Sequence, residues 1–171
     1  EIVGTSELGG CRHRIIPDRI ETGTLLVAGA ITGGDVTVTN AMPRHLSALL
    51  AKLEEAGVVV ETGEDRVRCR GPQRPRPADV ITSPYPGFPT DMQAQVMTLL
   101  GLADGLSRIT ETIFENRFMH AAELNRMGAR LEIDGATALV RGVPHYQGAP
   151  VMATDLRASA SLVLAGLAAR G

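Results

Sequence analysis

The sequence predicts an α/β fold in which sheets lie on the outside and largely apolar helices are enclosed between them. Two observations lead to this class. Two segments of equal length share one pattern of strands and a helix, and an almost uniformly apolar helix precedes each of them. Strands joined through helices form parallel sheets, and a helix that is apolar on most sides must be covered on most sides. With 171 residues, 44% of them hydrophobic, the chain is long enough for one such core.

The internal repeat relates residues 34–71 to residues 105–142, at an offset of 71 positions. In each copy a short strand precedes a helix that a glycine ends, and a strand, a turn and another strand follow. The pairs that coincide include Thr39 and Thr110, Leu53 and Leu124, Gly57 and Gly128, and Glu61 and Glu132. The copies are therefore predicted to be structural duplicates.

The first copy shows the physical basis of the pattern. Pro43 stands where a first helical turn tolerates a missing N–H. Residues 58–60 are valines, residues 62–65 have turn composition, and Val67 then alternates with arginines, which predicts a hairpin with one solvated face. Between Pro43 and these valines, leucines recur at helical spacing at positions 46, 49, 50 and 53.

Three apolar helices are expected, at about residues 19–32, 91–104 and 156–170. The first two precede the two copies, and the third is followed by the glycine where a third copy would begin its next strand. We therefore expect one partial domain of a longer protein, with units at about residues 11–82, 83–152 and 153–171.

Composition argues against several classes of function. Lys and Arg number 17 against 19 Asp and Glu, a net charge of −2, which argues against a general affinity for nucleic acid or anionic lipid. The longest run of small apolar residues is shorter than a membrane span of about 20 residues, and no signal-peptide pattern is present, so we expect a soluble cytoplasmic protein. The four histidines show no metal-ligand spacing, and no metal or cofactor is expected.

Cys11 and Cys69 are the only cysteines, and their spacing predicts reduced, unpaired thiols. Cys11 follows two glycines, but residues 12–16 alternate like a strand. We therefore expect Cys11 to be structural.

The most informative segments are residues 88–95 and 109–120, which concentrate polar and charged residues beside Pro, Phe and Met. Such groups, held by packing partners, are typical of a cleft, and we interpret the two segments as halves of one site. Asp91 opens a helix, so its residue type also fits a first-turn carboxylate at the positive helix end. Arg117 also fits a surface ion pair with Glu111 or Glu115.

These two segments and residues 17–24 and 153–166 resemble the UDP-N-acetylglucosamine 1-carboxyvinyltransferases, a family of enolpyruvyl transferases. The resemblance implies an inside-out α/β barrel, or α-β prism, with three βαβαββ units in each of two domains that face a cleft. It implies transfer of the enolpyruvyl group of phosphoenolpyruvate to the 3-hydroxyl of UDP-N-acetylglucosamine, the first committed step of peptidoglycan synthesis. The second catalytic domain has no counterpart in this chain, and the chain alone is expected to be inactive.

The resemblance also implies roles for single residues. Asp91 matches the residue that contacts the sugar 3-hydroxyl and is proposed as its base. Asp155 matches one beside the enolpyruvyl group and the reactive loop of the opposite domain, where it either assists proton transfer or holds a lysine or arginine. By the same resemblance, Arg117 orders carboxylates and helps to position the nucleotide sugar, while Ile113 and Phe114 contact the substrate through the backbone and the ring respectively. Residues 12–17 depart from the pattern that follows the family's reactive cysteine, so Cys11 is not expected to be that thiol.

Alternatives remain at this stage. Asp155 and Arg157 also fit a local capping pair, and Asp18, Arg19 and Glu21 fit either the cleft or a set of caps and ion pairs. The related enolpyruvyl transferase of the shikimate pathway shares the fold and chemistry, and a noncatalytic binding module derived from the family is a third possibility. The oligomeric state is open.

Overall fold

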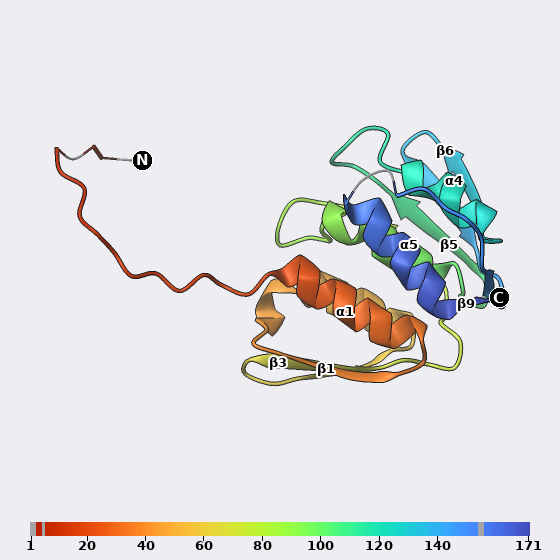
Figure 1. The fold of residues 1–171 in the computed structure, drawn as a ribbon, viewed down its shortest axis with the longest axis horizontal. Helices are drawn as coiled ribbons and strands as arrows, with labels where there is room; N and C mark the ends of the chain where they lie inside the picture. Colours follow the sequence, from red (N-terminus) through yellow and green to blue (C-terminus); the bar gives the residue numbers. More distant parts are fainter. Residues whose placement is uncertain (1–2, 5, 154–155) are drawn as a thin grey trace.

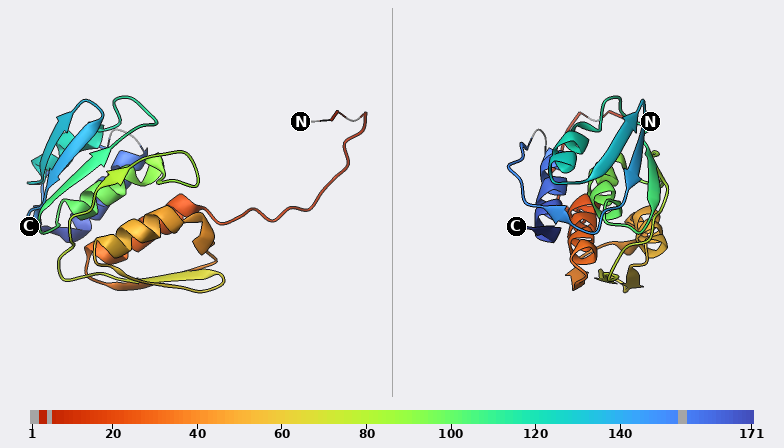
Figure 2. Two further views of the ribbon diagram at one scale, coloured as in Figure 1. Left: turned by 180° about the vertical axis from the view of Figure 1, so that it is seen from behind. Right: turned by 90° about the vertical axis from the view of Figure 1, so that its right-hand side faces the viewer.

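The structure, a computed structural model, describes residues 3–4, 6–153 and 156–171 (Figure 1). Two sheets lie on either side of a layer of helices, so the helices form the centre of the molecule (Figures 1 and 2). The predicted arrangement, with sheets outside and helices between them, is what these residues show.

The first copy of the repeat forms a three-stranded sheet with order β1-β3-β2, in which both outer strands run antiparallel to β3. The hairpin β2–β3 is as predicted, but β2 continues through Thr62, so the turn covers residues 63–65 instead of 62–65. The elements in chain order are α1 (Arg19–Ile31), β1 (Asp35–Thr39), the 3-10 helix η1 (Pro43–His45), α2 (Ser47–Glu55), β2 (Val59–Thr62) and β3 (Arg66–Arg70).

The second copy forms a four-stranded sheet with order β4-β5-β7-β6. Strand β4 is parallel to β5 and is joined to it through α3, which is the predicted crossover. The elements are β4 (Val80–Ile81), the 3-10 helix η2 (Thr90–Met92), α3 (Gln93–Leu100), β5 (Leu106–Thr110), α4 (Met119–Arg126), β6 (Arg130–Asp134) and β7 (Thr137–Arg141).

A short third unit follows, in which β8 (Tyr146–Gln147) pairs in parallel with β9 (Ala169–Arg170) across α5 (Leu156–Ala168). Strands β1 and β5 begin 71 residues apart, as do β3 and β7. The register repeats too, since Asp35 faces Arg70 and Leu106 faces Arg141. The predicted duplication is therefore confirmed at the level of single residue pairs.

The core lies between the sheets and the helices α1, α3 and α5, which contact one another. All eight residues of α3 are buried, as the prediction of a helix enclosed on most sides requires. In the first sheet, Val67 and Cys69 are fully buried toward the helices, while the arginines that alternate with them point to the other face. Gly57 and Gly128 end α2 and α4 with φ of 93° and 84°, a conformation that costs other residues energy.

Two predicted helices differ in extent from the structure. The second does not run to Asp104, because α3 ends at Leu100 and a 3-10 turn replaces its first residues. Tyr146 explains the early end, since its hydroxyl donates to the carbonyl of Thr98 at 2.7 Å and lies against Gly101. The third helix ends at Ala168, because the next two residues pair with β8.

The strand expected at residues 12–16 is wrong. Residues 6–17 form no strand and extend away from the rest of the chain (Figures 1 and 2). Ile15 is 82% exposed and Cys11 is exposed as well, so the expectation that Cys11 has a structural role is wrong too. Alternation of apolar residues makes a strand only where a neighbouring strand supplies hydrogen bonds and a core covers one face.

Within the described ranges, no helix is both long and apolar enough to cross a membrane.

Candidate active site

Asp91 lies in the 3-10 turn η2, at the start of α3. Its side chain lines an open hollow of about 390 Å³ that is formed where α1, α3 and α5 begin. The other residues of this hollow are Asp18, Ile20, Glu21, Thr24, Leu25, Gln95, Leu156 and Ala160. The hollow therefore combines two further carboxylates, a hydroxyl and an amide with apolar walls.

Arg117 lies in the loop between β5 and α4 and pairs with Asp91, with Nη2 and Oδ1 2.9 Å apart. The side chains of Arg117 and Asp91 are 18% and 31% exposed, so this is a partly buried ion pair. The guanidinium also lies over the ring of Phe114, 4.7 Å from its centre. The alternative of a surface pair with Glu111 or Glu115 is wrong, because the partner of Arg117 comes from the other segment.

The structure thus joins the two segments that the sequence analysis interpreted as halves of one site. Ile113, Phe114 and Arg117 line a second hollow of about 420 Å³, next to the β6–β7 turn. Ile113 is 36% exposed and Phe114 is 54% exposed, so both offer surface to a bound molecule. This exposure fits the backbone and ring contacts expected of them, which stay predictions.

Asp155 lies outside the described residues, and so does the side chain of Arg157. The predicted capping pair between them therefore has no structural description. Leu156, which follows Asp155, is 83% exposed and lines the hollow beside Asp91.

Asp18 caps α1, because its Oδ1 accepts from the amides of Ile20 and Glu21 at 2.6 and 3.2 Å. It also lines the hollow beside Asp91, so the cap is confirmed for Asp18 and its role in the cleft stays a prediction. Arg19 lies 5.0 Å above the ring of Tyr85.

Two buried polar residues near Asp91 were not predicted to be part of the site, although both lie in the two singled-out segments. Gln95 is 1% exposed and its amide donates to the hydroxyl of Thr24 at 3.2 Å, which links α3 to α1. Glu111 is 3% exposed and accepts hydrogen bonds from Thr82 and Thr90. A signal existed for Glu111, since this carboxylate follows a strand directly and lies within residues 109–120, a segment already singled out.

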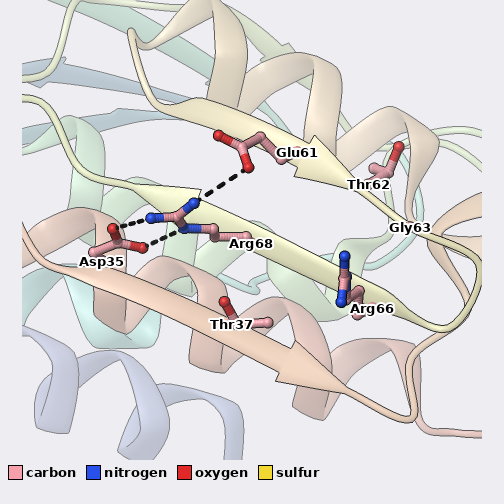
Figure 3. Close-up of a pocket in the computed structure, with 7 residues that line it drawn as sticks. All are labelled: Asp35, Thr37, Glu61, Thr62, Gly63, Arg66 and Arg68. Atoms are coloured by element: carbon pink, nitrogen blue, oxygen red, sulfur yellow. Dashed lines mark hydrogen bonds and ion pairs between the residues drawn. The ribbon is translucent and has the colours of Figure 1, made fainter.

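Another charged surface hollow, about 520 Å³, lies elsewhere, on the face of the first sheet that points away from the helices (Figure 3). There Arg68 forms a two-point contact with Asp35, at 2.8 and 2.6 Å, and a weaker one with Glu61 at 3.4 Å. The hydrogen bond from Arg68 holds the pKa of Asp35 below its ordinary value, and the same contact raises the pKa of Arg68. These charges neutralise one another, so the hollow offers little to a charged ligand.

The described part of the chain contains no group of three or more His, Cys, Asp or Glu side chains arranged to hold a metal ion. Cys69 donates to the carbonyl of Leu26 at 3.1 Å, and burial raises the pKa of its thiol. This thiol is a packed core group, and it lines neither of the hollows beside Asp91 and Arg117.

Comparison with known proteins identifies the class. The family model of EPSP synthase (3-phosphoshikimate 1-carboxyvinyltransferase) matches residues 1–171, and the chain belongs to this family. In line with this, an enolpyruvyl transferase, NikO from Streptomyces tendae, shares the α/β fold with a TM-score of 0.81 and 32% identity, over 91% of this chain and 37% of that one. EPSP synthase from Acinetobacter baumannii, at 20% identity and a TM-score of 0.68 over 90% of this chain and 38% of that one, shows the fold alone.

The curated relatives are more specific. UDP-N-acetylglucosamine 1-carboxyvinyltransferase of Anaeromyxobacter sp. (strain K) is 61% identical over 170 residues, which are 99% of this chain and 40% of that protein. The protein of the same description from Geobacter metallireducens is 59% identical over 98% of this chain and 40% of its own length. The resemblance inferred from four sequence segments is therefore confirmed, and the chain spans about 40% of the length of these relatives.

Proposed function

We propose that this chain is part of an enzyme that transfers the enolpyruvyl group of phosphoenolpyruvate to the 3-hydroxyl of UDP-N-acetylglucosamine. The observation that carries the proposal is the Asp91–Arg117 pair beside the hollow at the helix starts. Identity of 61% to enzymes of that description, against 20% to a solved EPSP synthase, favours the nucleotide sugar over a phosphorylated carbocycle as acceptor.

In this proposal Asp91 takes the proton of the sugar hydroxyl, and Arg117 fixes the direction of the carboxylate and attracts the anionic nucleotide. The oxygen of the sugar adds to C2 of phosphoenolpyruvate while C3 gains a proton. The tetrahedral adduct then loses phosphate and a proton from C3, which restores the double bond. Helix starts beside Asp91 favour negative charge, as two anionic substrates require.

The remaining assigned residues complete one wall of the site. Ile113 contacts the sugar nucleotide through its backbone, and Phe114 does so through a ring that Arg117 already holds. Asp155 assists proton transfer beside the enolpyruvyl group. Its support is sequence resemblance and its neighbour Leu156, which lines the hollow of Asp91.

We further propose that the chain is most of one domain, an inside-out α/β barrel of three βαβαββ units, and that a second domain supplies the opposite wall and the phosphate-binding groups. Two described units with the same register and the start of a third support this proposal. Val163 and Leu167 of α5, 65% and 56% exposed, fit a surface that a third sheet covers. The isolated chain is then inactive.

The test uses a complete enzyme in which this chain replaces the matched 40% of the Anaeromyxobacter relative. Phosphate release should require UDP-N-acetylglucosamine, and shikimate 3-phosphate should not replace it. Asp91→Ala should lower kcat by about 10²- to 10⁴-fold, the range for a positioned base. Asp35→Asn is the matched control, because Asp35 also pairs with an arginine but lies on the outer face of the first sheet.

Near-normal turnover of the Asp91→Ala enzyme would remove Asp91 from the reaction. Phosphate release by the isolated chain at the rate of the complete enzyme would overturn the two-domain proposal.

A further inference from the structure

Glu111 is a buried carboxylate that belongs to no ion pair within the described residues, although the sequence places it among charged neighbours. It follows β5 directly, and both of its oxygens accept hydrogen bonds. Oε1 accepts from the hydroxyl of Thr82 at 2.9 Å and from the amides of Ile113 and Phe114 at 2.9 and 3.2 Å. Oε2 accepts from the hydroxyl of Thr90 at 2.8 Å.

These four donors come from three separate segments. Thr82 follows β4, and Thr90 opens the 3-10 turn that carries Asp91. Ile113 and Phe114 belong to the loop that carries Arg117. A second contact strengthens the junction, because the amide of Thr112 donates to the hydroxyl of Thr82 at 2.8 Å. The carboxylate of Glu111 thus joins the backbone of the loop that carries Arg117 to Thr90, the residue before Asp91.

The Asp91–Arg117 ion pair closes a ring of contacts whose other side is Glu111. Asp91 is bonded to Thr90 through the chain, Thr90 donates to Glu111, and Glu111 holds the start of the loop that ends at Arg117. We propose that Glu111 is a positioning residue: it sets the distance and direction of the Asp91–Arg117 pair without touching substrate. This inference rests on the proposed function, and it adds a residue to the same site.

The internal repeat supplies a comparison within the same molecule. The position that corresponds to Glu111 in the first copy, 71 residues earlier, is Asn40, which is exposed and has a φ of 53°. The first copy forms the same β1-β3-β2 arrangement without a buried carboxylate there. Burial of a carboxylate is costly unless hydrogen bonds compensate for lost hydration. The fold therefore does not require Glu111, and its burial is explained by the loop and turn that it connects.

The first experiment measures amide hydrogen exchange of the 171-residue chain and needs no activity. Glu111→Ala should accelerate exchange at Ile113 and Phe114 about tenfold or more, while the amides of the β5–β7 ladder change little. Glu111→Gln should largely restore protection, because its carbonyl replaces Oε1 and its NH₂ group donates to the hydroxyl of Thr90. Asn40→Ala is the matched control and should leave these two amides unchanged. Unchanged exchange in the Glu111→Ala chain would overturn the proposal.

If the alanine variant does not fold, Thr90→Val tests the same junction, since it removes one donor and keeps the shape of the side chain. This variant should accelerate exchange at Met92, which follows Asp91, with less effect in the β5–β7 ladder. Equal acceleration throughout the chain would mean a general loss of stability and would contradict a local role.

The second experiment uses the complete chimaeric enzyme. Glu111→Ala should lower kcat about 10- to 100-fold with a smaller change in KM for the nucleotide sugar, because misplacement of a reacting group by about 1 Å costs about 10²-fold. In the double variant with Asp91→Ala, the loss should equal that of Asp91→Ala alone, since Glu111 acts through Asp91. Additive losses would overturn the positioning role. Full activity of Asp91→Ala would instead remove Asp91 from the reaction. Phosphate release by the wild-type chimaera that does not require UDP-N-acetylglucosamine would refute the proposed function, while the exchange result stands independently of both.

Discussion

The ion pair between Asp91 and Arg117 is the contact whose removal is most informative, because it joins the two segments of the candidate site. Exposed ion pairs contribute about 0–1 kcal/mol to stability, and breaking fully buried ones costs about 3–5 kcal/mol. With exposures of 31% and 18% and a separation of 2.9 Å, the pair lies between these limits. We expect a coupling free energy of about 1–2 kcal/mol.

A double-mutant cycle measures this coupling. The free energy of unfolding of the chain is obtained by urea denaturation for wild type, Asp91→Asn, Arg117→Gln and the double variant. The cycle is needed because each residue has other contacts, such as the ring of Phe114 beneath Arg117, whose loss cancels in the double difference. Equal m-values across the four proteins would show that the unfolding transition itself is unchanged.

The matched control is the cycle for Lys52 and Glu55, an exposed pair three residues apart on α2 with a 2.7 Å contact. Its coupling should be about 0.2–0.5 kcal/mol. If the Asp91–Arg117 coupling falls within about 0.3 kcal/mol of zero, the pair contributes nothing measurable to stability and does not hold the two segments together.

Three further predictions concern groups outside the site. One of the two cysteines, Cys11, should react with a thiol reagent at once, while Cys69 should react only on unfolding, because burial excludes the reagent and raises the thiol pKa; fast reaction of both would contradict this. Tyr146→Phe should lose about 1–2 kcal/mol of stability, because the buried carbonyl of Thr98 loses its donor. Burial raises the pKa of Tyr146, so this stabilisation is present below pH 10 and is lost as the pH rises further. Above pH 10, the difference in unfolding free energy between wild type and Tyr146→Phe, measured by urea denaturation, should therefore decrease. Arg68 lowers the pKa of Asp35, so the stabilisation that Asp35→Asn removes is present above about pH 4. This stabilisation is lost as the pH falls through the lower pKa of the folded state. If the difference in unfolding free energy between wild type and Asp35→Asn stayed the same below pH 4, the Arg68 contact would not be its source.

Much of the fold was predictable because its signals are local and occur twice. Leu46, Leu49, Leu50 and Leu53 are all buried as their spacing predicts, and the strands of the two copies pair in the same register. The strand expected at residues 12–16 fails for the complementary reason, since its pattern is local but a strand also requires a neighbour. The length of α3 was not predictable either, because Tyr146, 45 residues beyond Gly101, sets its end.

The site was predictable in part. Asp91, Ile113, Phe114 and Arg117 were found from unusual polar composition and from resemblance, and the structure places Asp91 and Arg117 in contact. The partner of Arg117 was not predictable from its own segment, which contains two closer carboxylates in sequence. Burial of Glu111 was not predictable either, because it depends on donors from Thr82 and Thr90, 29 and 21 residues away.

The sequence by itself determined the class of fold, the duplicated unit and the two segments that carry the site, because hydrophobic spacing and glycine positions act over one or two turns of chain. Only the tertiary structure decided which charges meet. Asp91 and Arg117 pair, and Glu111 is buried behind them, because the parallel pairing of β4 and β5 brings the ends of both strands to one edge of the sheet. Contact between charges depends on distance in space, which the order of residues does not specify.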